Sequence, residues 1–264
     1  MNDWRTYDDV AETYERVHAD RLAEPARDLV EMTALPDGAR VLDVGTGTGV
    51  AAQVAADSGA TIVGIDESVG MLMVARRERP KVPVVAAQAI DLPFGPGTFD
   101  AVLGSFVLAH FTKVETVLFD IARVLRPGGR IGFTTWADGV DAYQQAWREL
   151  VESVVPREML APAYAEAAPW HERFRKRTAV EEALIDAKFR SVRTEIFKYH
   201  WTYPLEEYLD GLQVWATGRF VKNMLGDAGW SSLRERARSL FAERFPDPLN
   251  DFREVIVATA TKTA

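Results

Sequence analysis

The sequence predicts an α/β fold with a mostly parallel sheet, and three observations lead to this prediction. Short apolar runs alternate with amphipathic helical segments between residues 40 and 136, at the spacing of βαβ units. The stretch Val41–Gly49 (VLDVGTGTG) joins a β-branched run to glycines at alternate positions, which is typical of a strand that turns tightly into a helix. The stretch Arg126–Gly129 (RPGG) ends a helix and turns the chain into another strand. Parallel strands with right-handed crossovers place ligand sites at the carboxyl ends of the strands.

Residues 6–34 are expected to be helical and to lie across the domain as a cover, because their apolar positions keep a helical spacing that continues past Pro25. The strands expected in the alternating region are short apolar runs, at 40–44, 61–65, 83–87, 99–104 and 130–135. The helices between them are expected at 48–58, 68–78 and 113–125, and the last of these repeats its apolar residues on one helical face.

Beyond Trp136 the pattern changes. Residues 138–177 are expected to form a helical cap over the carboxyl edge of the sheet. The stretch Thr178–Glu181 (TAVE) has the spacing of a capping box, which predicts a helix over 179–187. A strand is expected to follow at 192–201. Helices are then expected at 204–217, 219–228 and 231–244, and a final strand at 254–261. The chain is thus divided into cover helices and ligand-binding core (1–137), cap insertion (138–177), and C-terminal completion of the sheet with substrate-side helices (178–264).

The amino-acid composition excludes several classes of partner and of chemistry. The 264 residues are 47% hydrophobic and carry a net charge of −8, which argues against nucleic acid as a partner. There is no cysteine, so disulfides and thiolate catalysis are excluded, and no spacing of histidines and acids predicts a metal site. The N-terminus lacks the features of a signal peptide, and no apolar run reaches about 18 residues. We therefore expect a cytoplasmic monomer or homodimer with no membrane partner.

The glycine stretch predicts a seat for a nucleotide-type cofactor, because glycines let the backbone approach a ligand and the following helix presents free N–H groups. Asp43 ends the first strand, and Asp66 ends the second, where an acid can accept hydrogen bonds from ribose hydroxyls. A dinucleotide fingerprint (G-x-G-x-x-G) would need glycine directly after Gly49, where this chain has Val50. A carboxylate at Asp43 suits a cofactor with a cationic amino-acid end. An NAD-dependent dehydrogenase is the competing interpretation.

Four ordered motifs together resemble the class I S-adenosylmethionine (SAM) methyltransferases, in particular the UbiE-like small-molecule methyltransferases. They are Val41–Gly49 (motif I), Gly64–Asp66 (the ribose acid), Ala86–Phe94 with Phe99–Val102 (similar to D-A-x-x-L-P-F…F-D-x-V), and Val124–Gly129 (the turn before strand five). The resemblance covers residues 5–136 well and 178–262 more loosely. It implies a Rossmann-like seven-stranded sheet with an antiparallel last strand. It also implies SAM as cofactor, S-adenosylhomocysteine (SAH) as product, and a small, aromatic or otherwise hydrophobic acceptor from secondary metabolism, methylated on O, N or C.

Carried onto this chain, the resemblance implies a set of cofactor contacts. They are Asp43, Gly45, Thr46 and Gly47 at the methionine end, Asp66, Glu67 and Met71 at the ribose and adenine, Gln88, Ala89 and Ile90 at the adenine, Ser105 on the methionine side, and Tyr14 closing over the cofactor. Gln88 departs from the pattern, since the family has an acid there, although an amide oxygen can also accept a hydrogen bond from the adenine amino group.

The acceptor side is expected to be lined by Phe106 and Trp136. A general base is needed only where the acceptor must lose a proton, and His110 and His18 are the candidates. The alternatives are a packing role for His110 beneath the cofactor and an exposed helical position for His18. A second function stays open on the same residues: a SAM-binding protein that catalyses a pericyclic or isomerising reaction, or serves as a binding module, without transferring methyl.

Overall fold

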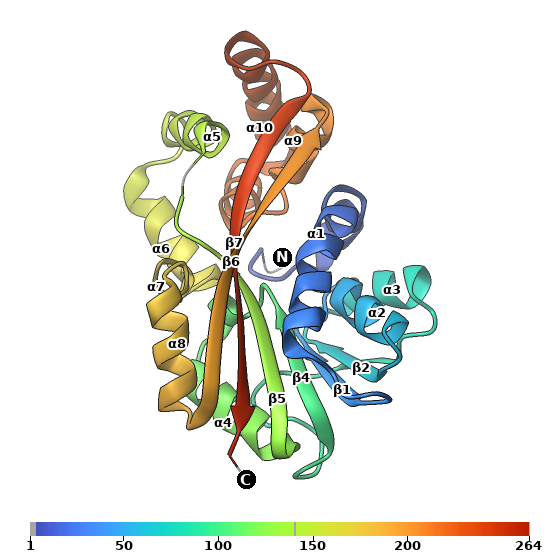
Figure 1. The fold of residues 1–264 in the computed structure, drawn as a ribbon. Coiled ribbons are helices and arrows are strands. Elements are labelled where there is room, and N and C mark those ends of the chain that lie inside the picture. The colour runs from blue at the N-terminus through green and yellow to red at the C-terminus, as the bar shows by residue number, and fades with distance from the viewer. Residues whose placement is uncertain (1–3, 140, 264) are drawn as a thin grey trace.

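The computed structural model describes residues 4–139 and 141–263 and has one seven-stranded sheet of order β3-β2-β1-β4-β5-β7-β6. The strands are β1 (Arg40–Val44), β2 (Thr61–Asp66), β3 (Val84–Ala86), β4 (Phe99–Ser105), β5 (Leu125–Trp136), β6 (Phe189–Tyr203) and β7 (Leu249–Lys262). The first five pair in parallel, and β7 runs antiparallel between β5 and β6 (Figure 1). The predicted Rossmann-like sheet with an antiparallel last strand is therefore confirmed. The strand order reverses between β1 and β4, so their carboxyl ends flank a crevice.

Helices cover both faces of the sheet. On one face lie α1 (Ala11–Thr33), α2 (Val50–Asp57) and α3 (Val69–Glu78), and on the other α4 (Val114–Val124) and α8 (Arg177–Asp186). Alternate residues of β1 enter the two cores, with Val41 packed toward α1 and α2, and Leu42 toward α4. Because both faces are covered, these strands are apolar along nearly their whole length. Two short 3₁₀ turns, η1 (Asp8–Val10) and η2 (Leu108–His110), lie at the edge where the crevice opens.

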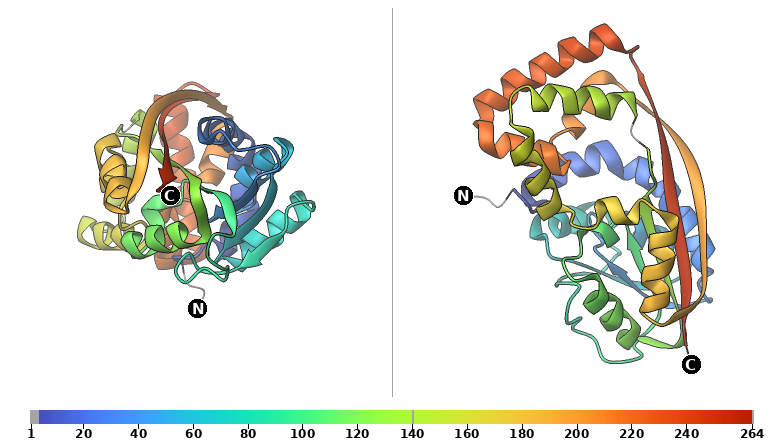
Figure 2. Two further views of the ribbon diagram at one scale, coloured as in Figure 1. Left: turned by 60° about the horizontal axis from the view of Figure 1, so that its bottom comes forward. Right: turned by 90° about the vertical axis from the view of Figure 1, so that its left-hand side faces the viewer.

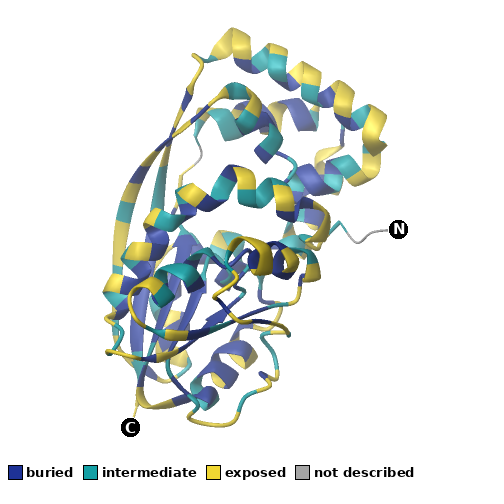
Figure 3. Cartoon of the chain, turned by 90° about the vertical axis from the view of Figure 1, so that its right-hand side faces the viewer, coloured by how far each residue is buried: buried dark blue, intermediate teal, exposed yellow. Residues whose placement is uncertain are grey.

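The cap is built from two separate parts of the chain. One part is α5 (Ala142–Glu152), α6 (Arg157–Ala167) and α7 (His171–Phe174), and the other is α9 (Leu205–Gly211) and α10 (Ala216–Arg244). Strands β6 and β7 run on past the sheet and carry α9 and α10 at their far ends, against α5 and α6 (Figure 2). The outward faces of the cap helices are exposed, and their inward faces are buried (Figure 3). We propose that the cap comprises both parts, so that the division at residue 178 separates segments that pack together.

Several expected elements differ from the structure. The two helices expected at 219–228 and 231–244 correspond to α10, which Gly226 (φ 65°, ψ 179°) interrupts with a non-helical conformation, so the break falls a few residues earlier than expected. Strands β6 and β7 are each longer than predicted, because they pair with one another over almost their full length. Strand β5 begins at Leu125, which pairs with Phe99 before a bulge at the expected turn.

The predicted capping box at Thr178 is wrong. Helix α8 starts at Arg177, two residues before the expected start at 179, and its N-cap residue, Lys176, makes no side-chain capping bond. Glu181 instead accepts a hydrogen bond from the Thr194 hydroxyl on β6, so a tertiary partner outcompetes the local one.

Candidate functional site

The turn after β1 is shaped by glycines in the left-handed region. Gly45, Gly47 and Gly49 have φ values of 68°, 56° and 89°. A Cβ on Gly45 would lie 2.3 Å from the Cγ2 of Val107, so only glycine fits there. At Gly47, by contrast, a Cβ would meet nothing of the described chain within 4 Å, so the backbone there is uncovered. Gly49 then begins α2.

Asp43 lies beneath this turn and is 1% exposed. One of its oxygens, Oδ2, accepts a 2.7 Å hydrogen bond from the Thr46 hydroxyl, whereas Oδ1 is buried without a partner among the described residues. Burial raises the pKa of Asp43 to about 7, against the hydrogen bond from Thr46, which lowers it. A buried carboxylate oxygen with no donor is a costly arrangement that a cationic ligand group would relieve.

The carboxylate of Asp66 connects the turn after β1 with the turn after β2. Its Oδ2 accepts a 2.8 Å bond from the backbone N–H of Gly47, and its Oδ1 a 2.9 Å bond from that of Ser68. Burial raises the pKa of Asp66, and these two backbone donors lower it. Each carboxylate oxygen keeps a second lone pair, so both can still accept hydrogen bonds from a diol.

The N-terminal segment is fastened beside Asp66. Asp8 in η1 accepts hydrogen bonds from the Ser68 hydroxyl (2.8 Å) and from the backbone N–H of Gly70 (2.7 Å). Tyr14 follows on α1, and its ring packs with the buried Met71 of α3. This segment is therefore fastened to the start of α3, beside Asp66.

The remaining residues expected at the adenine lie at the outer edge of the crevice. Glu67 and Gln88 are exposed, whereas Ala89 and Ile90 are half-buried against the core under α4. The exposed carboxylate of Glu67 acts on Asp66 through its charge.

Beyond the glycine turn, the end of β4 builds an aromatic wall. Phe106 has φ 55°, a left-handed conformation that costs a bulky residue about 1–2 kcal/mol. Its backbone N–H donates to the Thr134 hydroxyl (3.0 Å), and that hydroxyl lies 3.2 Å from the Oγ of Ser105. The Phe106 ring stacks on Trp136 with centroids 4.3 Å apart. The strained backbone thus holds a flat aromatic pair at the carboxyl ends of β4 and β5.

The two candidate bases lie at opposite ends of a row of rings. His110 is 6.0 Å from Tyr7, Tyr7 is 6.2 Å from Tyr14, and Tyr14 is 5.6 Å from His18, between ring centroids. The row passes over the crevice and connects η2 with α1. The row of rings therefore links the two histidines, which are not in direct contact with each other.

Both imidazoles are neutral near pH 7. Burial lowers the pKa of His110, whose Nδ1 lies 2.9 Å from the carbonyl oxygen of Ala167, so Nδ1 carries the proton and Nε2 is left as an acceptor. Burial also lowers the pKa of His18 to about 3, with contributions from Arg21 and Arg253. The Nε2 of His18 is buried without a partner among the described residues, so His18 is not an exposed helical residue.

Two residues of the site were not expected from the sequence. Tyr7 lies within the row of rings, and the guanidinium of Arg219 lies 4.0 Å over the Tyr7 ring. Arg219 is 5% exposed and donates a 2.9 Å hydrogen bond to the carbonyl oxygen of Trp4. The seven-residue spacing of Tyr7 and Tyr14 offers a weak signal for the tyrosine, but nothing local predicts a contact across more than 200 residues.

Among the described residues, no group of three or more histidines and acids could hold a metal ion. Within the same residues, no helix is both long and apolar enough to cross a bilayer.

The fold and the site are similar to those of the methyltransferases. Residues 42–133 match the family described as the methyltransferase domain, and this range holds the glycine turn, Asp66 and the strands that flank the crevice. The resemblance to the UbiE-like class I methyltransferases inferred from the motifs is thereby confirmed for the core of the chain.

Particular relatives extend this picture. The chain is 33% identical over 161 residues to a demethylmenaquinone methyltransferase of Paenarthrobacter aurescens, a match that covers 60% of this chain and 62% of that protein. It spans about half the length of the curated relatives it matches. The structure is similar to phosphoethanolamine N-methyltransferase 2 of Haemonchus contortus in complex with S-adenosyl-L-methionine (TM-score 0.60, 17% identity, 100% of this chain and 61% of that one). It is also similar to the [4+2]-cyclase SpnF (TM-score 0.53, 24% identity, 93% of this chain and 81% of that one). Both structural likenesses show the fold.

Proposed function

We propose that this protein is a SAM-dependent methyltransferase that acts on a small molecule. The observation that carries the proposal is the unpartnered Oδ1 of Asp43, buried beneath a glycine turn that is open at Gly47. An amino-acid ammonium would supply the missing donor, and a dinucleotide pyrophosphate would bring negative charge toward the same carboxylate. The buried carboxylate of Asp43 therefore fits SAM and disfavours NAD.

The cofactor contacts follow from this fit. Asp43 and the backbone of Gly45, Thr46 and Gly47 would hold the methionine end, with Ser105 beside it. Asp66 would accept hydrogen bonds from the ribose. The adenine would lie among the residues at the outer edge, namely Glu67, Met71, Gln88, Ala89 and Ile90, with Tyr14 across it.

When bound, SAM supplies an electrophilic methyl group on a sulfonium. The acceptor atom forms a bond to the methyl carbon while the carbon–sulfur bond breaks, so the protein must align the two and exclude water. The stacked pair of Phe106 and Trp136 would form the wall that orients the acceptor. His110 would take a proton at Nε2 where the acceptor must lose one.

The acceptor class is inferred from the wall and from the relatives. A planar aromatic or otherwise hydrophobic molecule suits stacking on Phe106 and Trp136. The matched curated proteins are named demethylmenaquinone methyltransferases. We extend from them only the idea of an aromatic acceptor, and we leave methylation at O, N or C open. Secondary metabolism and a cytoplasmic location remain predictions from the sequence.

The test is SAH formation. The purified chain is incubated with SAM and a panel of phenols, arylamines and aromatic compounds with acidic carbons, and SAH and methylated product are measured by mass spectrometry. We expect equal amounts of SAH and methylated product with at least one class of compound, and the loss of both products in Asp66→Ala. An acceptor consumed without SAH formation would instead indicate a pericyclic or isomerising catalyst.

A further inference from the structure

A second polar cluster lies where β7 meets the start of α5. Arg253 on β7 is its centre, two residues before Val255, which pairs with Trp136. Its guanidinium lies 6.0 Å from the Trp136 ring and 5.5 Å from the Trp215 ring. Its charge also contributes to the lowered pKa of His18, which places it on the acceptor side of α1.

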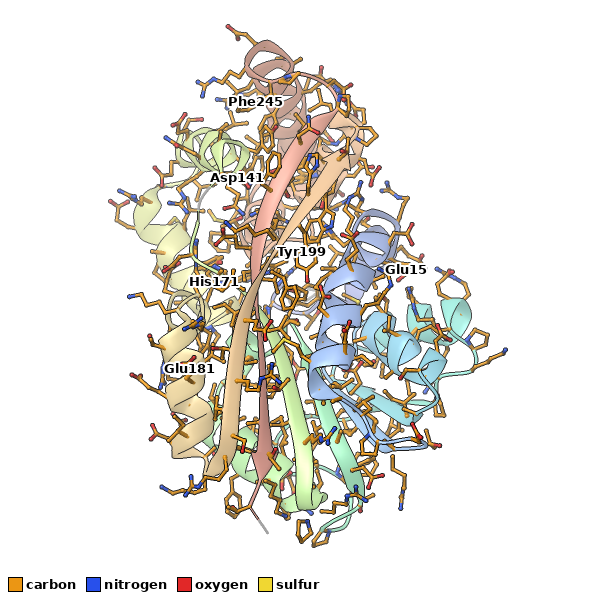
Figure 4. All side chains as sticks on the ribbon, viewed as in Figure 1. Glu15, Asp141, His171, Glu181, Tyr199 and Phe245 are labelled. Carbon is orange, nitrogen blue, oxygen red and sulfur yellow. The ribbon has the colours of Figure 1, made fainter. Side chains whose placement is uncertain are left out.

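Two carboxylates flank this guanidinium. The Nε of Arg253 donates a 2.8 Å hydrogen bond to Oδ2 of Asp251, and its Nη2 lies 2.9 Å from Oδ2 of Asp141, without the alignment of a hydrogen bond. Asp141 also caps α5 by accepting from the backbone N–H of Gln144 (2.6 Å), and Figure 4 shows it at the entry to that helix beside β7. Two carboxylates and one guanidinium leave one negative charge uncompensated in the cluster.

Three oxygens in this cluster are buried without a hydrogen-bond partner among the described residues: Oδ2 of Asp141, Oδ1 of Asp251 and the hydroxyl of Tyr208. Asp251 is 2% exposed and Tyr208 is 4% exposed. The Tyr208 ring lies 5.8 Å from the ring of Tyr143, two residues after Asp141, and burial together with the charge of Asp141 raises the pKa of Tyr208. Natural cores rarely leave three such atoms together unsatisfied.

The chemistry of the missing group follows from these atoms. A primary ammonium has one positive charge, which matches the uncompensated negative charge, and it has donors for Oδ1 of Asp251 and the hydroxyl of Tyr208, while Oδ2 of Asp141 keeps its ion pair with Arg253. A hydroxyl has one donor and no charge. Arginine fits poorly beside the guanidinium that is already present, because its planar fork needs a larger space.

We propose that this cluster is an anchor for a primary ammonium of the methyl acceptor. This inference rests on the proposed function, since the anchored molecule is the one that receives the methyl group. A protonated amine has no free electron pair, so the anchored nitrogen is not the atom that is methylated. The acceptor therefore carries an amine at one end, held by Asp251 and Tyr208, and its nucleophilic atom at the other, near Phe106.

A proton competes with the amine for the two carboxylates. Burial raises the pKa of Asp251 to about 6, Arg253 opposes this, and the neighbouring Asp141 raises it further, so the two carboxyl groups can share one proton when no amine is bound. An amine would displace that proton, whereas a neutral ligand would leave it in place.

The experiment compares phenethylamine with 2-phenylethanol, which differ in the ammonium alone, by calorimetric titration into protein saturated with SAH. We expect the amine to bind at least about tenfold more tightly than the alcohol, the difference made by hydrogen bonds to charged groups. Asp251→Asn should remove the preference without changing SAH affinity. Glu254→Gln is the matched control. It removes a carboxylate from the same strand, but this carboxylate forms an ion pair with Lys198 and does not face the cluster.

Tyr208→Phe provides a second variant that keeps the ring packed on Phe241 and removes only the hydroxyl. It should weaken the amine several-fold and leave the alcohol unchanged. Equal binding of the two probes, absence of binding by the amine, or a preference that survives in both variants would overturn the anchor. The protein is first titrated with SAH alone. If SAH does not bind in that titration, the result counts against the proposed function itself, so the two failures are distinguishable.

Discussion

The carboxylate of Asp66 accepts a 2.8 Å hydrogen bond from the backbone N–H of Gly47, which ties the end of β2 to the glycine turn that follows β1. The bond sets the position of an acid and of an open backbone with respect to each other before any ligand arrives. A preorganised pair of this kind reduces the ordering that binding would otherwise require.

Replacement of Asp66 by alanine tests this relationship. Loss of the ribose contacts and of the bond to Gly47 should weaken SAM binding by about 1–3 kcal/mol, measured by calorimetry. Asp57→Ala, at the exposed end of α2, serves as control and should leave the affinity unchanged. Unaltered affinity in Asp66→Ala would show that the cofactor is not held at this acid.

Gly45→Ala should destabilise the fold. The new Cβ would lie 2.3 Å from Val107 Cγ2 at a backbone φ of 68°, so steric overlap adds to backbone strain. We expect a loss of about 2–4 kcal/mol in the free energy of unfolding, measured with chemical denaturant. Gly38→Ala is the matched control, because its φ of 65° is similar and its surroundings are open.

The contribution of Val107 can be separated from that of the backbone. The double variant Gly45→Ala with Val107→Ala should be more stable than the sum of the two single losses predicts, because the second change removes the 2.3 Å contact with Cγ2 and leaves Val107 Cβ at 2.8 Å. Strict additivity would mean that the strain lies in the backbone alone.

SAM affinity should rise with pH. The raised pKa of Asp43, about 7, means that the free protein holds a proton on this carboxyl at lower pH, whereas an ammonium partner requires the carboxylate. Affinity should therefore increase as pH rises toward about 7 and level off above it, by at most about tenfold per pH unit, with proton release on binding. Calorimetry in buffers of different ionisation enthalpy measures both effects. Asp43→Asn should flatten the profile, and a flat profile in the unmodified protein would contradict the assignment.

His110→Gln should lower turnover and spare cofactor binding. The bond between Nδ1 and the Ala167 carbonyl fixes the ring so that Nε2 can accept a proton, and loss of a general base costs about 10²–10⁴-fold in rate. His171→Gln, a half-buried histidine on α7, is the control. Turnover that stays at the original level in His110→Gln would rule this residue out as the base, and the same comparison with His18→Gln tests the second candidate.

The core of the fold was predictable because its signals are local. The glycines of the first turn, the acids that end β1 and β2, and the apolar runs of five strands each lie within a few residues of the structure they specify. The long strands β6 and β7 were only partly predictable, since each owes its length to a partner about 60 residues away. The capping box at Thr178 failed for a similar reason, because Glu181 bonds to Thr194 on the neighbouring strand.

The site divides in the same way. Asp43, Asp66 and the glycines follow from strand ends and turns, whereas the contact of Arg219 with Tyr7 depends on the cap folding back over the N-terminus. The cluster around Arg253 likewise joins α5, α9 and β7, and no periodicity in the sequence reports that meeting.

The most direct measurement is calorimetric titration of the purified chain with SAM, with SAH and with NAD. The proposal predicts binding of SAM and SAH at about micromolar dissociation constants and none of NAD. Folded protein that gives no heat with SAM or SAH, or that binds NAD in their place, would contradict it.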